Sequence, residues 1–277
     1  MLPFIRHLPG YWGNLYRRAT TMVATLDEKY IKTAKRTYDP NHVRGIVDSL
    51  LKMKSERRDN KLDWFTDEHI SNIVYDIIIA GVLTSYASIT GLFLIILNHA
   101  HVQKQIQDEI DKVIGQGRKP RVADCKNMPY THACILEAMR YISVIPVPLA
   151  RLASRDVNLD GYLIDKGSMV VISKLTTIKY KKPWTFDPER YLDDDGHLIL
   201  SEDPRRQSST SFGLGRRQCP GESFATKRIF LFITTFLQQF KLLPAKEHDL
   251  PSCDSRGFRQ QFTLSPDPYY CRTESRT

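Results

Sequence analysis

The sequence predicts a mainly α-helical fold with a small β annex. Apolar residues recur at helical spacing over several long stretches, and one of these stretches is uncharged along most of its length. After Pro146 and Pro148 the texture changes to short β-prone runs separated by Gly161 and Gly167. The 277 residues suffice for one large core, and no linker or repeat interrupts them. We therefore expect residues 1–277 to form part of a single domain.

The first third of the chain predicts a loop followed by helices. Residues 1–15 are aromatic and rich in Pro and Gly, which is typical of a loop, and residues 16–37 read as a basic helix. Asp39-Pro40-Asn41 breaks this helix and opens another, which carries apolar residues at helical spacing over 43–51. A charged connector, 54–62, follows.

A long helix is predicted over residues 66–98. A capping threonine and two acidic residues open it, and no Asp, Glu, Lys or Arg occurs from Ile77 to Gln103. That length suffices to span a bilayer, although Thr84 and Ser85 lie in its middle. The alternatives are a transmembrane helix and a helix buried at the centre of a large domain.

The remaining elements are helices around the β annex. We expect helices over 102–114, 131–143 and 221–240, short strands at 157–159, 162–164 and 169–172, an irregular segment over 183–218, and a strand pair that contains 262–264. An irregular segment of this length within a compact domain is usually functional.

The composition limits the partners and the compartment. The formal net charge of +9 favours acidic partners or an anionic membrane surface, and we expect no nucleic-acid partner. Five cysteines without close spacing predict neither a disulfide framework nor a zinc site, which favours a reducing compartment. The N-terminus has no long apolar stretch of the kind found in a signal peptide.

The most informative motif is the segment 212–222, which we call the cysteine loop: Phe-Gly-Leu-Gly-Arg-Arg-Gln-Cys-Pro-Gly-Glu. Its glycines allow positive φ and close approach to a flat partner. Cys219 directly precedes a predicted helix, whose free N–H groups favour a thiolate over a thiol. Arg217 adds a cation that suits a carboxylate. The alternative is a Gly/Arg loop with an inert buried cysteine.

The full pattern Phe-x-x-Gly-x-Arg-x-Cys-x-Gly resembles the haem-binding signature of the cytochrome P-450 family. The resemblance implies a haem b (iron protoporphyrin IX) whose metal ligand is the Cys219 thiolate. It also implies that Phe212 packs beside the sulfur and that Arg217 pairs with a haem propionate. The other residues implied to contact the cofactor are Gly213, Gly215, Gly221 and Arg151.

Two further motifs resemble those of the same family. Glu137-Ala138-Met139-Arg140 is similar to the family's Glu-x-x-Arg motif, although alone it would be an ordinary surface ion pair. Phe186-Asp187-Pro188-Glu189-Arg190-Tyr191 is similar to the Pro-Glu-Arg-Phe segment. The resemblance implies a buried structural triad of Glu137, Arg140 and Arg190.

The long helix resembles the oxygen-binding helix of the family at residues 80–85. Ala80 and Gly81 are then the small residues that leave room for dioxygen, and Thr84 supplies a hydroxyl near it. This resemblance favours the buried helix over the transmembrane alternative. Leu83 occupies the usual acidic position, and a leucine cannot relay a proton.

The resemblance covers nearly the whole chain but only about the C-terminal half of the family. The family's membrane anchor and its N-terminal haem-contacting helix have no counterpart, so the N-terminal part is expected to be missing. The segment Ser173 to Trp184 is also shortened relative to the family.

The resemblance implies a microsomal haem-thiolate monooxygenase on the cytosolic face of the endoplasmic reticulum membrane, in peripheral contact with it. It would hydroxylate an apolar small molecule with O2 and with electrons passed from NADPH by a reductase flavoprotein. The alternatives are a haem-thiolate isomerase or dehydratase, because of Leu83, and a truncated fragment without activity. The residues expected to line the substrate pocket are Val147, Leu149 and Phe262, and those expected near the electron donor are Arg205, Arg206, Arg216, Lys227 and Arg228.

Overall fold

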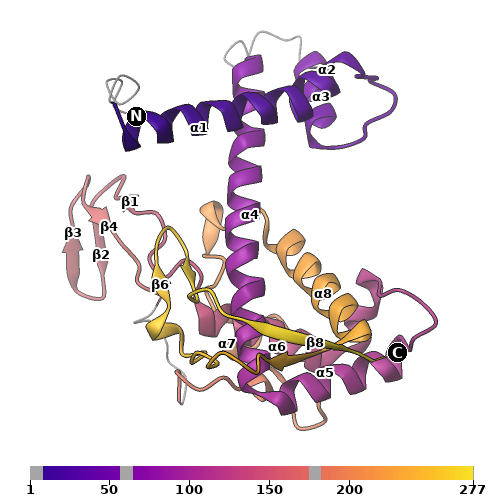
Figure 1. Cartoon of the computed structure of the whole chain (residues 1–277). Coiled ribbons are helices and arrows are strands. Elements are labelled where there is room, and N and C mark those ends of the chain that lie inside the picture. The colour runs from indigo at the N-terminus through magenta and orange to yellow at the C-terminus, as the bar shows by residue number, and fades with distance from the viewer. Residues whose placement is uncertain (1–8, 57–64, 175–181, 277) are drawn as a thin grey trace. The chain divides into compact units, whose positions relative to one another are not determined.

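The computed structural model describes residues 9–56, 65–174 and 182–276 (Figure 1). Its contacts divide the chain into two compact units, residues 1–82 and 83–277, which are described separately below. The single domain expected for residues 1–277 stays a prediction. The observed elements confirm the mainly α fold with a small β part.

The first unit contains α1 (Tyr11–Leu26), a π-helical segment (Asp27–Lys32), α2 (Thr33–Arg36) and α3 (Ile46–Glu56). The loop expected over 1–15 is wrong from Tyr11 onward, because Gly10 at φ 73° turns the chain into a helix earlier than the composition indicated. Residues 1–8 lie outside the described residues, as does most of the charged connector, from 57 to 62. A small cluster of Ile31, Val47 and Val74 is buried in this unit.

Helix α4 (Asp67–Asn98) confirms the long helix, and the Thr66 hydroxyl accepts the His69 N–H at 3.4 Å near its start. Among the described residues, α4 alone is long and apolar enough to cross a membrane, and 28% of its most apolar window is buried. The stretch 91–97 is almost entirely buried, whereas Leu83 and Tyr86 are exposed. A central helix is expected to be buried on every side. In α4 this expectation is confirmed only near the C-terminal end. Hydropathy indicates where burial would be favourable and does not supply the covering elements.

The second unit is built on α5 (Ala100–Val113), α6 (Pro129–Ile142) and α8 (Glu222–Gln239), together with the end of α4. These bounds confirm the three predicted helices to within two residues. Phe93 of α4 packs on Phe236 of α8, with ring centroids 4.8 Å apart. The irregular segment holds three short helical turns, at Pro188–Tyr191, Pro204–Gln207 (α7) and Gly215–Arg217, and a further 3-10 turn covers Val122–Asn127.

The β annex of the second unit consists of short antiparallel pairs. Strands β2 (Val157–Leu159) and β3 (Tyr162–Ile164) form the predicted hairpin, whose turn residues Asp160 and Gly161 both have positive φ. The other pairs are β1 (Arg151–Leu152) with β4 (Met169–Val170), β5 (Phe240–Pro244) with β8 (Cys271–Ser275), and β6 (Arg259–Gln260) with β7 (Leu264–Ser265). Strands β1, β5 and β8 were not predicted from the sequence. The strand predicted over 169–172 ends at Val170.

Candidate functional site

The backbone of the cysteine loop is held by its own hydrogen bonds. The Gly213 N–H donates to the Thr210 carbonyl at 2.9 Å, and the Cys219 N–H donates to the Phe212 carbonyl at 2.9 Å. Between them, the Gln218 N–H donates to the Gly215 carbonyl at 2.9 Å. The loop therefore folds back on itself and places Cys219 beside its first residue.

Glycine is required at two positions of this loop. Gly213 has φ 80° and Gly215 has φ 73°, a region that side chains strain. No other atom lies within 4 Å of where their Cβ atoms would be, so the space beside both residues is open. Phe212 is half-buried and packs against the main apolar cluster of this unit, which anchors the loop to the core.

Cys219 presents an exposed free thiol at the start of α8. Gly221 precedes the helix, and a Cβ there would lie 3.7 Å from the Cys219 sulfur. The helix N-terminus has N–H groups without intrahelical partners and the positive end of the helix dipole. The inert buried cysteine, which was the alternative for this loop, is excluded by the exposure of Cys219.

Cationic side chains lie beside the loop. The Arg151 guanidinium donates to the Arg217 carbonyl at 3.5 Å, which brings two of the predicted propionate partners together, and both side chains are exposed. Lys174, which the sequence analysis did not single out, donates from its ammonium to the Ser211 carbonyl at 2.6 Å. No motif in the sequence marks Lys174, because its contact joins segments 37 residues apart.

The predicted triad is assembled and buried. Two N–H groups of Arg140 donate to the two oxygens of Glu137, each at 2.7 Å, and Arg190 Nε lies 3.5 Å from Glu137 Oε1. The Glu137 side chain is 0% exposed, and those of Arg140 and Arg190 are 4% and 9% exposed. The ordinary surface ion pair, which was the alternative for this motif, is therefore wrong.

Backbone groups complete the triad. The Asp187 N–H donates to Glu137 at 3.0 Å, and Arg140 donates to the Pro183 carbonyl at 2.7 Å. Burial raises the pKa of Glu137, and the hydrogen bonds from Arg140 oppose that rise. One carboxylate thus faces two guanidinium groups, and backbone carbonyl oxygens accept further N–H groups of both arginines. The triad ties α6 to the segment that follows the shortened region.

The predicted oxygen-binding residues lie on one face of α4. Ala80 and Gly81 are one helical turn before Thr84, whose carbonyl accepts the Ser88 hydroxyl at 2.8 Å. Ala80 and Gly81 belong to the first unit, whereas Thr84 and Cys219 belong to the second. The structure does not place the first two against the cysteine loop, and their role stays a prediction.

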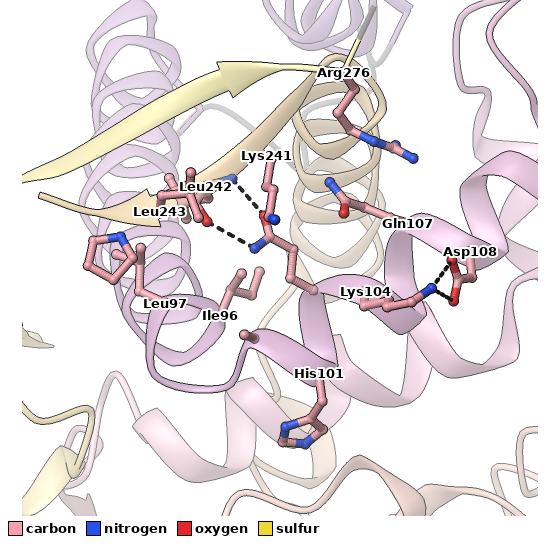
Figure 2. Close-up of a pocket in the computed structure, with 13 residues that line it drawn as sticks. Ile96, Leu97, His101, Lys104, Gln107, Asp108, Lys241, Leu242, Leu243 and Arg276 are labelled. Carbon is pink, nitrogen blue, oxygen red and sulfur yellow. Dashed lines mark hydrogen bonds and ion pairs between the residues drawn. The ribbon is translucent and has the colours of Figure 1, made fainter.

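Two other features of the second unit could hold small ligands. A groove of about 600 Å³ is lined by the end of α4, α5, β5 and Arg276 (Figure 2), and none of the predicted site residues lines it. Most of its polar groups are paired: Gln103 exchanges two hydrogen bonds with the Leu242 backbone, and Lys104 pairs with Asp108. The groove is therefore a seam between packed elements.

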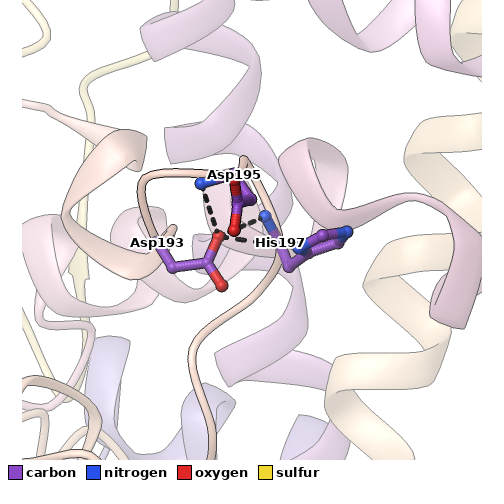
Figure 3. Close-up of side chains that lie close together, drawn as sticks. All are labelled: Asp193, Asp195 and His197. Atoms are coloured by element: carbon purple, nitrogen blue, oxygen red, sulfur yellow. Dashed lines mark hydrogen bonds and ion pairs between the residues drawn. The ribbon is translucent and has the colours of Figure 1, made fainter.

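The second feature is a group of three exposed side chains, Asp193, Asp195 and His197, whose potential ligand atoms lie within 4.8 Å of one another (Figure 3). Asp193 Oδ1 accepts the backbone N–H of Asp195 at 3.1 Å and that of His197 at 2.8 Å. The carboxylate thus serves the turn itself.

Comparison with known proteins decides the family. The family model "Cytochrome P450" matches residues 1–272. The chain belongs to the cytochrome P-450 family. Members of this family hold a haem through a cysteine thiolate, and Cys219 is the cysteine of this chain that lies in the matching signature.

Curated cytochromes P-450 match most of the chain. Cytochrome P-450 2D4 of Rattus norvegicus is 34% identical over 275 residues, which are 97% of this chain and 53% of the relative. Cytochrome P-450 2D10 of Mus musculus is 34% identical over 87% of this chain and 47% of the relative. A vitamin D(3) 25-hydroxylase of Sus scrofa is 33% identical over 97% of this chain and 53% of the relative. The chain spans about half the length of the curated relatives it matches.

Proposed function

We propose that this chain supplies the haem-binding part of a cytochrome P-450 monooxygenase, with Cys219 as the thiolate ligand of haem b. The observation that carries the proposal is the exposed Cys219 thiol at the N-terminus of α8, held in a glycine loop by the hydrogen bond from its own N–H to the Phe212 carbonyl. A sulfur in this position is accessible to a metal.

The residues around Cys219 fit a haem. The open space at Gly213 and Gly215 allows a flat group to approach the loop backbone. Arg151 and Arg217 are exposed beside the loop and provide guanidinium groups suited to two carboxylates. The donor set therefore matches a flat, apolar cofactor that carries an anionic edge.

When bound, the haem supplies dioxygen activation for the insertion of one oxygen atom into an apolar substrate. The chain's own residues would do the rest: Cys219 would ligate through sulfur, Phe212 would pack beside the sulfur, and Arg151 and Arg217 would hold the carboxylates. The Thr84 hydroxyl is proposed to hold a proton near the reacting oxygen, with Ala80 and Gly81 leaving room for it. Glu137, Arg140 and Arg190 act structurally, by fixing the fold beneath the site.

The partners follow from the same proposal. The substrate class is an apolar small molecule, and the exposed Val147, Leu149 and Phe262 are its proposed contacts. Electrons come from NADPH through a reductase flavoprotein. The proposed location is the cytosolic face of the endoplasmic reticulum membrane, as the family resemblance implies, and a charge of +9 favours peripheral contact with anionic lipid.

Leu83 favours a second candidate function, a haem-thiolate isomerase or dehydratase. Leu83 stands at the position where the resembling motif carries an acidic residue, and its side chain is 44% exposed. Such a reaction rearranges an oxygenated substrate and needs no proton delivery through a carboxylate at this position. Dependence on NADPH separates the two candidates.

The test of the proposed function uses two exposed cysteines as a matched pair. Cys219→Ser should abolish the thiolate-type spectrum of the reduced, CO-bound haem protein, because a serine hydroxyl does not replace a thiolate ligand. Cys271→Ser, at the other exposed cysteine, should leave that spectrum intact. A thiolate spectrum that survives in Cys219→Ser would refute the proposal.

A further inference from the structure

Lys174 follows β4 in the chain and is tied at two points. Its backbone N–H donates to the Pro146 carbonyl at 2.8 Å, and its ammonium donates to the Ser211 carbonyl at 2.6 Å. The side chain is half-buried, so its reach is set by packing and not by free rotation in solvent. Lys174 therefore connects the segment after β4 to Ser211, the residue that directly precedes the cysteine loop.

Lys174 binds the carbonyl of Ser211, which is the neighbour of Phe212, the backbone partner of Cys219. Ser211 precedes Phe212, whose carbonyl accepts the Cys219 N–H at 2.9 Å. A contact that fixes Ser211 therefore also restrains the Phe212 carbonyl, which accepts the hydrogen bond that positions the backbone of Cys219. Burial lowers the pKa of Lys174, and the Cys219 sulfur opposes that lowering.

We propose that Lys174 is a positioning residue for the cysteine ligand: it holds the loop at Ser211 and places a positive charge in the field of the Cys219 sulfur, so that the reduction potential of the haem iron is raised. The proposal rests on haem ligation by Cys219. A cation near the thiolate reduces the electron density that the sulfur donates, and groups just outside the ligand shell tune metal sites in this way.

The experiment compares Lys174→Met, which removes the charge at similar length, with Lys174→Arg, which keeps it. Lys166→Met is the matched control, because Lys166 is an exposed lysine of the same unit, in the turn between β3 and β4. Each haem-loaded protein is titrated to obtain its reduction potential. At a fixed potential, Lys174→Met should show a reduced-to-oxidised ratio about three- to tenfold below wild type, where tenfold corresponds to about 59 mV for one electron. Lys174→Arg and Lys166→Met should stay near wild type.

A second readout needs no haem. In the apoprotein, amide hydrogen exchange of the peptide covering residues 210–222 should be faster in Lys174→Met than in wild type. In Lys174→Arg the exchange rate of this peptide should stay near that of wild type. Lys166→Met should leave this peptide unchanged. This measurement decides the anchoring role even if Lys174→Met loads haem poorly.

The outcomes separate this inference from the proposed function. If wild type lacks a thiolate spectrum, the proposed function fails, and the exchange measurement still tests the anchor at Ser211. If wild type has that spectrum but Lys174→Met keeps both its potential and its exchange rate, the role of Lys174 is refuted. Equal shifts in Lys174→Met and Lys166→Met would also refute it, since the effect would then be one of net charge.

Discussion

Glu137 has no contact with solvent and balances two buried guanidinium groups. Its contribution to the free energy of unfolding therefore depends on the buried positive charge that its removal would leave. The exposed pair Lys104–Asp108 of α5 has a distance of 2.7 Å, the same as the shortest contact in the triad, but both side chains are mostly exposed. Geometry alone therefore does not separate these two ion pairs. Burial does, because an uncompensated charge costs far more in the interior than in water.

Glu137→Ala should lower the free energy of unfolding by about 3–5 kcal/mol, because Arg140 would stay buried without a carboxylate and Arg190 would keep only its 3.7 Å contact with Asp187. Asp108→Ala, the control, should cost less than ~1 kcal/mol, as exposed pairs do. Urea unfolding followed by circular dichroism measures both. Similar losses in the two variants would contradict the structural role of the triad.

Leu83 determines how the proposed chemistry should respond to substitution. Leu83→Asp introduces a titratable carboxyl next to Thr84 on α4, so the product formed per NADPH oxidised should rise at least about twofold if the chain supports monooxygenation. The measurement uses a P-450 reductase and a 7-alkoxycoumarin as an apolar reporter substrate, with released peroxide counted alongside product. Leu83→Asn, which has no titratable proton, is the control and should not improve coupling. No gain in Leu83→Asp would support the isomerase or dehydratase candidate.

At the scale of elements, the contact between α4 and α6 depends on Gly91. A Cβ at Gly91 would lie 2.6 Å from Cδ1 and 3.1 Å from Cγ1 of Ile142, a fully buried residue of α6. Close packing leaves Ile142 little room to move away. The glycine thus lets the two helices approach each other closely at Ile142.

Gly91→Ala should reduce the free energy of unfolding by about 1–2 kcal/mol, since overpacking outweighs the roughly 1 kcal/mol gain in helix propensity. Ile142→Val removes the nearer atom, so the double variant Gly91→Ala/Ile142→Val should recover part of the loss. Gly81→Ala, where no other atom lies within 4 Å of the new Cβ, should be neutral or stabilising. Chemical denaturation of the four proteins provides the comparison, and a stabilised Gly91→Ala would contradict the close approach.

At the scale of the whole molecule, the cations behind the net charge of +9 differ in how far they are already engaged within the chain. Of the cations predicted near the electron donor, Arg205 pairs with Asp203 at 2.8 Å, and Arg206 donates to the Ile199 carbonyl at 3.0 Å. Lys227 is exposed on α8, and Arg228 lies over the exposed Phe224 ring at 5.6 Å. The pair on α8 therefore remains the proposed docking site for an acidic flavoprotein.

Replacing Lys227 and Arg228 by Glu should lower reductase-supported kcat/KM about tenfold at low ionic strength, with a smaller effect at high salt, because screening weakens steering between charged surfaces. Peroxide-supported turnover should stay near wild type. The control reverses Lys112 and Lys119, which are exposed on α5 and the loop after it. Equal loss with reductase and with peroxide would show damage to the haem site, and the docking proposal would be abandoned.

The family and the local elements could be predicted from residues that are close in the chain. The cysteine signature, the Glu-x-x-Arg spacing and the helical periodicity each lie within one segment. Gly161 likewise predicts the turn in which it has a positive φ. Short strands such as β5 and β8 could not be found in this way, because their register pairs Phe240 with Ser275 across 35 positions of sequence. Strand pairing at that separation leaves no periodic trace.

What the sequence by itself determined is the mainly α-helical class, the cytochrome P-450 family and the place of Cys219 in that family's signature, since each is carried by a local pattern. Only the tertiary structure decided that Glu137 is buried against two arginines, that the end of α4 alone is well covered, and that Lys174 holds the cysteine loop at Ser211. The physical reason is that burial and electrostatic environment depend on which distant segments meet. The same Glu and Arg at the same spacing would be an exposed ion pair on another helix.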